Sequence, residues 1–104
     1  MKRIASLMSV NPGKAAEYAR RHNPIWSDLA EVLRTHGAHN YSIFHDEKTG
    51  NLFAYVEVED EARWQAVART EVCQRWWRHM SPIMPSNPDN SPVSLPLTEV
   101  FHQD

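Results

Sequence analysis

The segment that most constrains the fold is NLFAYVEVE, residues 51–59, in which apolar side chains recur at every second position. Successive side chains of a strand point to opposite faces of its sheet, so this spacing puts one unbroken apolar row on one face. That row is formed by Leu52, Ala54, Val56 and Val58. The other face alternates aromatic and acidic residues, namely Phe53, Tyr55, Glu57 and Glu59. We therefore expect a sheet with helices packed on one face.

Three further strands are predicted around this segment. AHNYSIFH, residues 38–45, is rich in β-branched and aromatic residues and is joined to residues 51–59 by a hairpin turn in which Gly50 supplies a positive φ. RIASLMSV, residues 3–10, carries apolar residues on both alternating faces, which predicts a strand covered on both sides. LTEVFH, residues 97–102, is expected to be the last strand.

Asparagine–proline pairs predict where two helices begin. Asn11-Pro12 favours a helix over residues 12–22, because Asn can cap the N-terminus and Pro lacks an N–H that the first turn does not need. Asn23-Pro24 repeats this signal, so a break and a second helix are expected there. The second helix has an apolar stripe and a terminal glycine, formed by Ile25, Trp26, Leu29, Val32, Leu33 and Gly37.

A third helical region follows the hairpin. Asp60 is the expected N-cap of its first part, and Thr70 restarts it as EVCQRWWRHM, residues 71–80. The chain becomes proline-rich and irregular after Pro82. The predicted order of strand, helix, strand, strand, helix and strand is that of an α+β, ferredoxin-like fold, a four-stranded antiparallel sheet with helices on one face. We expect a single domain over residues 1–104.

The face of this sheet that the helices leave uncovered is unusually aromatic. With regular alternation it presents Tyr41, Ile43, Phe53 and Tyr55 among His39, Glu57 and Glu59. Such a surface is too aromatic for plain solvent exposure and too polar for a dry core. It can be covered by dimerisation, or it can form the wall of a pocket.

Charge and composition exclude several classes of function. The formal net charge is −2, and acidic and basic residues are interspersed, so there is no basic stripe for nucleic acid. No apolar run approaches the ~20 residues that span a membrane, and polar residues interrupt the N-terminal segment too often for a signal peptide. We expect a cytoplasmic protein with no membrane partner.

Metal and cofactor motifs are not found. The six histidines are scattered over separate predicted elements, and none has a compact metal-ligand spacing beside Cys73. The three glycines are isolated, so no glycine-rich phosphate loop is present. We expect no metal, and we interpret Cys73 as a small packed residue rather than a nucleophile.

His22 is the candidate acid–base group. Tyr18 lies four residues before it on the same helical face, and the break at Asn23 leaves His22 at the helix C-terminus. Such a position favours the imidazolium, and a His with an ordinary pKa near ~6.5 is then partly protonated at neutral pH, which suits a general acid. The alternative is that His22 only caps the end of the helix.

The adjacent Trp76 and Trp77 point about 100° apart on a helix, so their rings face different surroundings. Together with Tyr18 and Tyr41 they are suited to pack against the C–H-rich faces of a sugar, with core packing as the alternative. We assign Trp26 and Trp64 to the core. A loop further along contains Asn87, Asp89 and Asn90, which either cap a turn or offer polar groups to a ligand.

Four segments in register resemble the L-rhamnose mutarotase family: EYARRHNPIW, HGAHNYSIF, EVCQRWWRHM and MPSNPDNSPVS. The resemblance covers nearly the whole chain, departing in the hairpin HDEKTGN and at the extreme C-terminus. It implies a ferredoxin-like α/β-barrel subunit that forms a homodimer through its sheet. It also implies a cofactor-free isomerase that interconverts the α and β anomers of L-rhamnose. Family positions for the proton donor and the sugar-binding residues fall on His22 and on Tyr18, Tyr41, Trp76 and Trp77.

This chemistry requires one acid and one base. A proton must reach the ring oxygen and another must leave the anomeric hydroxyl, so that the ring opens, C1 rotates and the ring closes on the other face. The resemblance leaves the base open between a tyrosine, a carboxylate such as Asp89, and water. Two other hypotheses are a non-catalytic sugar-binding module and, by fold analogy alone, a monooxygenase.

Overall fold

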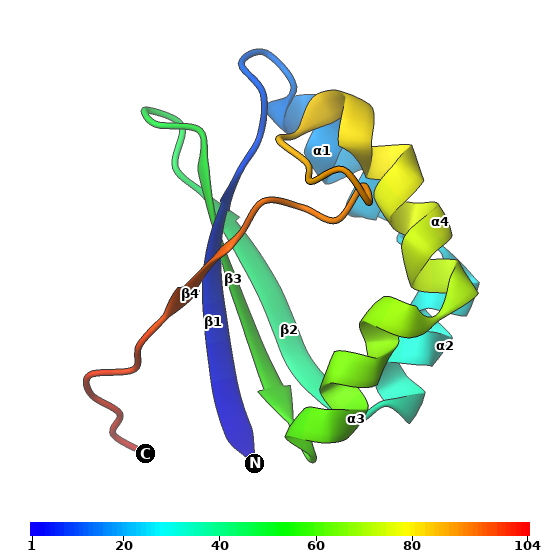
Figure 1. Cartoon of the computed structure of the whole chain (residues 1–104). Coiled ribbons are helices and arrows are strands. Elements are labelled where there is room, and N and C mark those ends of the chain that lie inside the picture. The colour runs from blue at the N-terminus through cyan, green and yellow to red at the C-terminus, as the bar shows by residue number, and fades with distance from the viewer.

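A computed structural model describes residues 1–104. It contains one four-stranded antiparallel sheet with the order β2-β3-β1-β4, and all helices lie on one face of it (Figure 1). The strands are β1 (Lys2–Ser9), β2 (Ala38–His45), β3 (Asn51–Val58) and β4 (Leu95–Leu97). The helices are α1 (Ala15–His22), α2 (Ser27–Thr35), α3 (Glu61–Ala66) and α4 (Glu71–Met80), with 3-10 turns η1 (Val67–Arg69) and η2 (Ser81–Ile83). The predicted α+β arrangement is confirmed. None of the helices combines the length and the apolar composition that a membrane span requires.

The apolar row of β3 faces the helices, as predicted. β3 pairs with β1 on one side and β2 on the other, and Val58 lies opposite both Lys2 and Ala38. All four residues of the row are buried, with Leu52 and Val58 the most fully so. Because this strand is central, its inner side chains have neighbours on every side.

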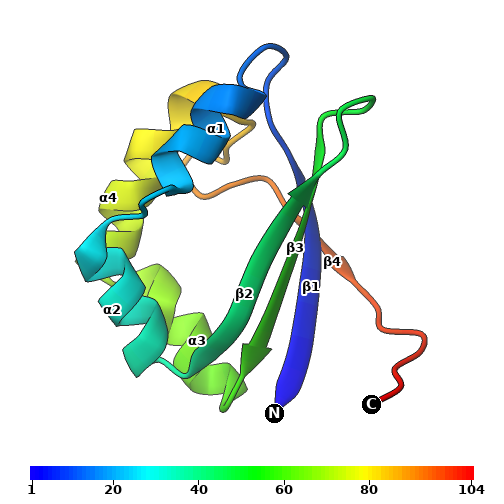
Figure 2. The same ribbon diagram turned by 180° about the vertical axis from the view of Figure 1, so that it is seen from behind.

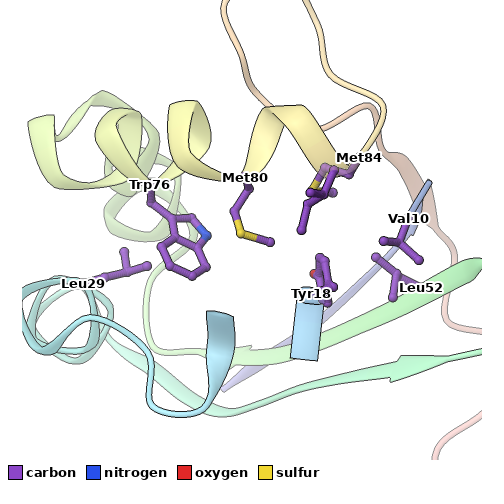
Figure 3. Packing of buried hydrophobic residues seen from close by; sticks show 8 residues of the cluster. Val10, Tyr18, Leu29, Leu52, Trp76, Met80 and Met84 are labelled. Atoms are coloured by element: carbon purple, nitrogen blue, oxygen red, sulfur yellow. The ribbon is translucent and has the colours of Figure 1, made fainter. Parts of the chain in front are cut away.

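The main hydrophobic cluster lies where α1 and α4 approach one end of the sheet. Figure 3 shows Trp76 and Met80 projecting from α4 toward Leu29 of α2 and Tyr18 of α1. The cluster consists of Val10, Tyr18, Leu29, Leu52, Trp76, Met80, Ile83 and Met84. Two of the predicted site residues are therefore also part of the core.

The first helix begins later than predicted. Pro12 and Gly13 form a turn, in which the Lys14 N–H donates to the Asn11 carbonyl at 3.0 Å, and α1 starts only at Ala15. Gly13 has a φ of +78°, which is outside the helical region and prevents the helix from starting at Pro12. Asn11-Pro12 is thus a turn signal in this chain.

The second asparagine–proline pair was also misread. α2 begins at Ser27, and Asn23 is instead the C-cap of α1. Its Nδ2 donates to the Ala19 carbonyl at 2.8 Å, so the side chain satisfies a carboxyl-terminal group of the preceding helix. The predicted break after His22 is confirmed.

The later caps agree with the sequence. The Asp60 carboxylate accepts the N–H groups of Ala62 and Arg63, and the Thr70 hydroxyl accepts that of Cys73. Gly37 ends α2 with a φ of +83°. The helical region after the hairpin is therefore split at Thr70, as predicted.

β2 contains a bulge that reverses its alternation. The pairing with β3 shifts between His39 and Ser42, and Asn40 adopts a φ of +51°. After the bulge, Ile43 lies opposite Ala54 and so faces the helices. The expectation that Tyr41 and Ile43 lie on the uncovered face is wrong, because one extra residue inverts every side chain that follows it.

The uncovered face is nonetheless apolar. Phe44 lies opposite Phe53 on it, and the β1 and β4 positions paired with this row add further side chains. The apolar members are Leu7, Phe44, Phe53, Leu95 and Leu97. We call this set the outer face.

The last strand lies earlier in the chain and is shorter than predicted, sharing only Leu97 with residues 97–102. β4 covers Leu95–Leu97 and pairs antiparallel with β1 through Ala5 and Leu7. Beyond it the chain leaves the sheet on the side away from the helices, as Figure 2 shows. Val100 and Phe101 are 92% and 76% exposed there. The β-branched and aromatic residues of LTEVFH favoured a strand, but they have no partner strand within this chain.

Candidate active site

A cavity of about 950 Å³ lies between the helices and the inner face of the sheet. It is lined by residues of α1 to α4, of η1 and of strands β1 to β3, and by the segment that follows α4. The predicted site residues all line it, namely Tyr18, His22, Tyr41, Trp76 and Trp77. The fold thus brings together side chains that are up to 59 positions apart in the sequence.

Tyr18 and His22 form a fixed pair on α1. Their rings stack with centroids 4.4 Å apart and planes inclined by 30°. The His22 Nδ1 lies 2.8 Å from the Tyr18 carbonyl oxygen, which can only accept a hydrogen bond. Nδ1 is therefore the donor, and in the neutral ring Nε2 carries the free lone pair. Nε2 has no partner within the chain.

Burial lowers the pKa of His22 below its ordinary value of 6.5. The hydrogen bond to Tyr18 acts in the opposite direction but does not outweigh the loss of hydration. The neutral form of the resting imidazole thus predominates at neutral pH. The expectation that its helix-terminal position keeps it partly protonated is wrong, since that argument left out the side chains that bury it.

The two tyrosines keep their protons. Burial raises the pKa of the Tyr18 phenol, with a smaller contribution from Tyr41. Loss of hydration likewise raises the pKa of Tyr41, although 42% of that residue stays accessible. Both hydroxyls are therefore hydrogen-bond donors across the neutral range.

Trp76 encloses the imidazole from the α4 side. It is 8% exposed, and its ring meets His22 edge-on at 5.1 Å and Trp26 edge-on at 5.0 Å. Trp77 is half-buried and also lines the cavity. The neighbouring tryptophans thus differ in environment, as their angular separation on the helix predicts.

Trp64 was assigned to the core, but it also lines the cavity, where its ring lies 5.8 Å from that of Tyr41. Sequence reasoning missed this contact because it placed Tyr41 on the opposite face. Trp26 is partly buried against the core, as expected, and the Arg75 guanidinium lies 5.3 Å from its ring.

The cavity contains no carboxylate. No Asp or Glu is among its lining residues, and most of the lining is hydrophobic. Asp89, one of the candidate bases, is directed to its own loop, where its Oδ1 accepts the N–H and the hydroxyl of Ser91. The imidazoles and phenols among the lining residues belong to His22, His45, Tyr18 and Tyr41.

Cys73 fits the packed role predicted for it. The residue is buried, and loss of hydration raises its thiol pKa to about 11. It is therefore protonated and a poor nucleophile. No cluster of three or more His, Cys, Asp or Glu side chains is arranged to hold a metal ion.

Comparison with known proteins gives one consistent family. A sequence model described as L-rhamnose mutarotase matches residues 3–103. The L-rhamnose mutarotase of Opitutus terrae is 65% identical, and that of Bacillus subtilis 58% identical, each over 100% of both chains. The crystal structure of the L-rhamnose mutarotase from Formosa agariphila has a TM-score of 0.92 at 41% identity, and all of both chains is covered.

More distant structures share the fold alone. A crystal structure of an antibiotic biosynthesis monooxygenase has a TM-score of 0.64 at 16% identity, covering 97% of this chain and 100% of the other. A dimeric ferredoxin-like protein from an uncultured marine organism has a TM-score of 0.70 at 12% identity, covering 99% of each chain. The ferredoxin-like fold is thereby established.

Proposed function

The chain belongs to the L-rhamnose mutarotase family, and from this premise we propose that it interconverts the α and β anomers of L-rhamnose in the cavity between its helices and its sheet. The observation that carries the proposal is the neutral imidazole of His22 on the wall of a cavity without carboxylates. Full-length matches to L-rhamnose mutarotases support the choice of sugar.

His22 is proposed to supply both proton transfers. Its Nε2 takes the proton of the anomeric hydroxyl while the bond between C1 and the ring oxygen breaks. The imidazolium so formed gives a proton to the ring oxygen, which leaves an open-chain aldehyde and a neutral imidazole. After rotation about the C1–C2 bond, the same steps in reverse close the ring on the other face. His22 is then the base for one oxygen and the proton donor for the other.

The alternatives for the base are less well supported. The raised pKa values of Tyr18 and Tyr41 keep both phenols protonated, and a protonated phenol does not accept the hydroxyl proton. Asp89 does not line the cavity. A single imidazole serves because the hydroxyl oxygen and the ring oxygen are both bonded to C1.

The aromatic residues are proposed to hold the sugar. Tyr18 and Tyr41 offer hydroxyl donors, and Trp76 and Trp77 offer ring faces or edges. Stacking is less directional than hydrogen bonding, so such walls tolerate the movement of C1 during ring opening. The apolar lining also suits the methyl group of a 6-deoxy sugar.

A homodimer through the outer face is proposed as the working form. The outer face exposes several large apolar side chains, with Phe44 and Leu95 the most exposed at 69% and 59%. A contiguous apolar surface of this kind is typical of a protein interface.

A cytoplasmic location is also proposed. Cys73 is a free thiol, which suits the reducing cytoplasm. Residues 1–104 are proposed to form one domain, because they build a single sheet.

The proposed function is tested by anomer exchange measured with saturation-transfer NMR. Irradiating the anomeric proton of α-L-rhamnose should reduce the β signal at a rate proportional to protein concentration. A non-catalytic binding module would instead broaden one anomer's signals without accelerating exchange. A monooxygenase would consume oxygen with a hydrophobic quinol substrate and leave the exchange rate unchanged.

A further inference from the structure

The segment after α4 turns back toward the cavity before it reaches β4. Figure 1 shows this orange segment lying between the helices and the sheet. Four of its residues line the cavity: Ser86, Asn90, Pro92 and Ser94. Its three candidate polar residues, Asn87, Asp89 and Asn90, differ in what their side chains contact.

Asn87 and Asp89 hold the loop together. The Asn87 carboxamide donates to the Ser91 hydroxyl at 3.0 Å, and its backbone N–H donates to the Ser91 carbonyl at 2.7 Å. The Asp89 Oδ1 accepts the Ser91 N–H at 3.0 Å. Neither Asn87 nor Asp89 lines the cavity. These two side chains are therefore occupied in fixing the turn.

Asn90 differs from both. It lines the cavity and is half-buried, and its carboxamide has no hydrogen-bond partner within the chain. Only its backbone takes part in the turn, where its N–H donates to the Asn87 carbonyl at 2.8 Å. Its φ is +72°, a conformation that glycine adopts without strain. The loop geometry thus does not require this side chain.

A sugar in this cavity needs polar partners that the lining supplies sparingly. The lining is mostly hydrophobic and has no carboxylate, whereas a pyranose carries several hydroxyl groups. A carboxamide both donates and accepts, so it can pair with a hydroxyl in either sense. We propose that the Asn90 carboxamide hydrogen-bonds a ring hydroxyl of the bound sugar and is a specificity-determining residue. This inference rests on the proposed function.

The test compares Asn90→Gly with Ser91→Ala in the full chain. Asn90→Gly keeps the loop conformation and removes only the carboxamide, so kcat/KM for L-rhamnose anomer exchange should fall about tenfold, as for one lost hydrogen bond. Ser91→Ala removes the hydroxyl that bonds Asp89 and Asn87, keeps the backbone bonds of the turn and leaves Asn90 in place. Its kcat/KM should therefore change by less than about threefold. Thermal unfolding of both variants establishes that they are folded.

Derivatives of L-rhamnose that lack one ring hydroxyl identify the partner of Asn90. For one derivative, kcat/KM should be low with the intact protein and should not fall further with Asn90→Gly, because both changes remove the same hydrogen bond. The inference is overturned if removing each hydroxyl lowers kcat/KM by the same factor in both proteins. It is also overturned if Asn90→Gly keeps the full kcat/KM for L-rhamnose. An intact protein that does not accelerate exchange would instead overturn the proposed function, and this inference with it.

Discussion

The imidazole of His22 stacks on the ring of Tyr18 at 4.4 Å, and its Nδ1 donates to the carbonyl of the same tyrosine at 2.8 Å. One residue thereby fixes both the plane and the tautomer of the imidazole. The ring of Trp76 meets the imidazole edge-on, with centroids 5.1 Å apart. The pair presents a neutral imidazole whose Nε2 is the only ring nitrogen left for a ligand.

The first prediction concerns the pH dependence of activity. The pKa of His22 is lowered below 6.5 by burial, and the proposed mechanism starts from the neutral ring. The protein-dependent kcat/KM should therefore reach a plateau on the alkaline side and fall on the acid side, with a midpoint below 6.5. Exchange rates corrected for the spontaneous reaction measure it. A rate that rises as the pH falls below 6.5 would indicate that the imidazolium is the resting reactant.

The same shift predicts a pH dependence of stability. Well above 6.5, the ordinary pKa of His, His22 is neutral in both the folded and the unfolded chain, so it adds no pH dependence there. As the pH falls, the unfolded chain takes up the proton first, and stability is lost until the folded pKa has been passed. The free energy of unfolding in urea should therefore fall more between about pH 7.5 and about pH 5 for the intact protein than for His22→Gln. Parallel changes in the two proteins would contradict the shift.

Tyr18→Phe separates the hydroxyl of this tyrosine from its ring. The variant keeps the stacking on His22 and loses the proposed donor to the sugar, so kcat/KM should fall about tenfold. Its free energy of unfolding should change by less than about 1 kcal/mol, because no hydrogen bond of the hydroxyl to the chain is lost. As a control, Tyr18→Ala should lower the free energy of unfolding by about 3–5 kcal/mol, as for other buried aromatic residues. Full activity in Tyr18→Phe would show that the Tyr18 hydroxyl does not contribute to sugar binding or exchange.

Asn40 is predicted to orient Tyr41. With a φ of +51°, Asn40 starts the part of β2 that turns Tyr41 toward the cavity. Glycine adopts this positive φ without strain, but a β-branched residue does not. Compared with Asn40→Gly, Asn40→Val should therefore have a free energy of unfolding lower by about 1–2 kcal/mol and a higher KM. Both variants lose the same exposed hydrogen bond to Glu57, which makes them a matched pair. Equal stability and equal KM in the two variants would show that the bulge does not depend on this residue.

Most of the fold could be predicted because its signals are local. The alternation in β3 and the side-chain caps at Asp60 and Thr70 need only neighbouring residues to act. The errors arose where a local signal had two meanings. Asn11-Pro12 reads as a helix start, but Gly13 at positive φ makes it a turn. The bulge at Asn40 has no strong signal, since Asn only tolerates such a φ.

The site was partly predictable for a related reason. The four-residue spacing of Tyr18 and His22 places them on one helical face, and the sequence alone indicates this. The approach of Trp76 to His22 depends on how α4 packs against α1, which no local pattern contains. The protonation of His22 was predicted in the wrong direction because it depends on that burial. The division of roles between Asp89 and Asn90 likewise required the loop geometry.

The central claim is that His22 carries the proton transfers, and His22→Gln tests it most directly. Glutamine keeps a polar side chain of similar reach but cannot exchange protons as an imidazole does. Saturation-transfer NMR with L-rhamnose gives the exchange rate, and line broadening in the same sample gives sugar binding. We predict that His22→Gln binds L-rhamnose and accelerates anomer exchange at least about a hundredfold less than the intact protein. Exchange as fast as that of the intact protein would contradict the account.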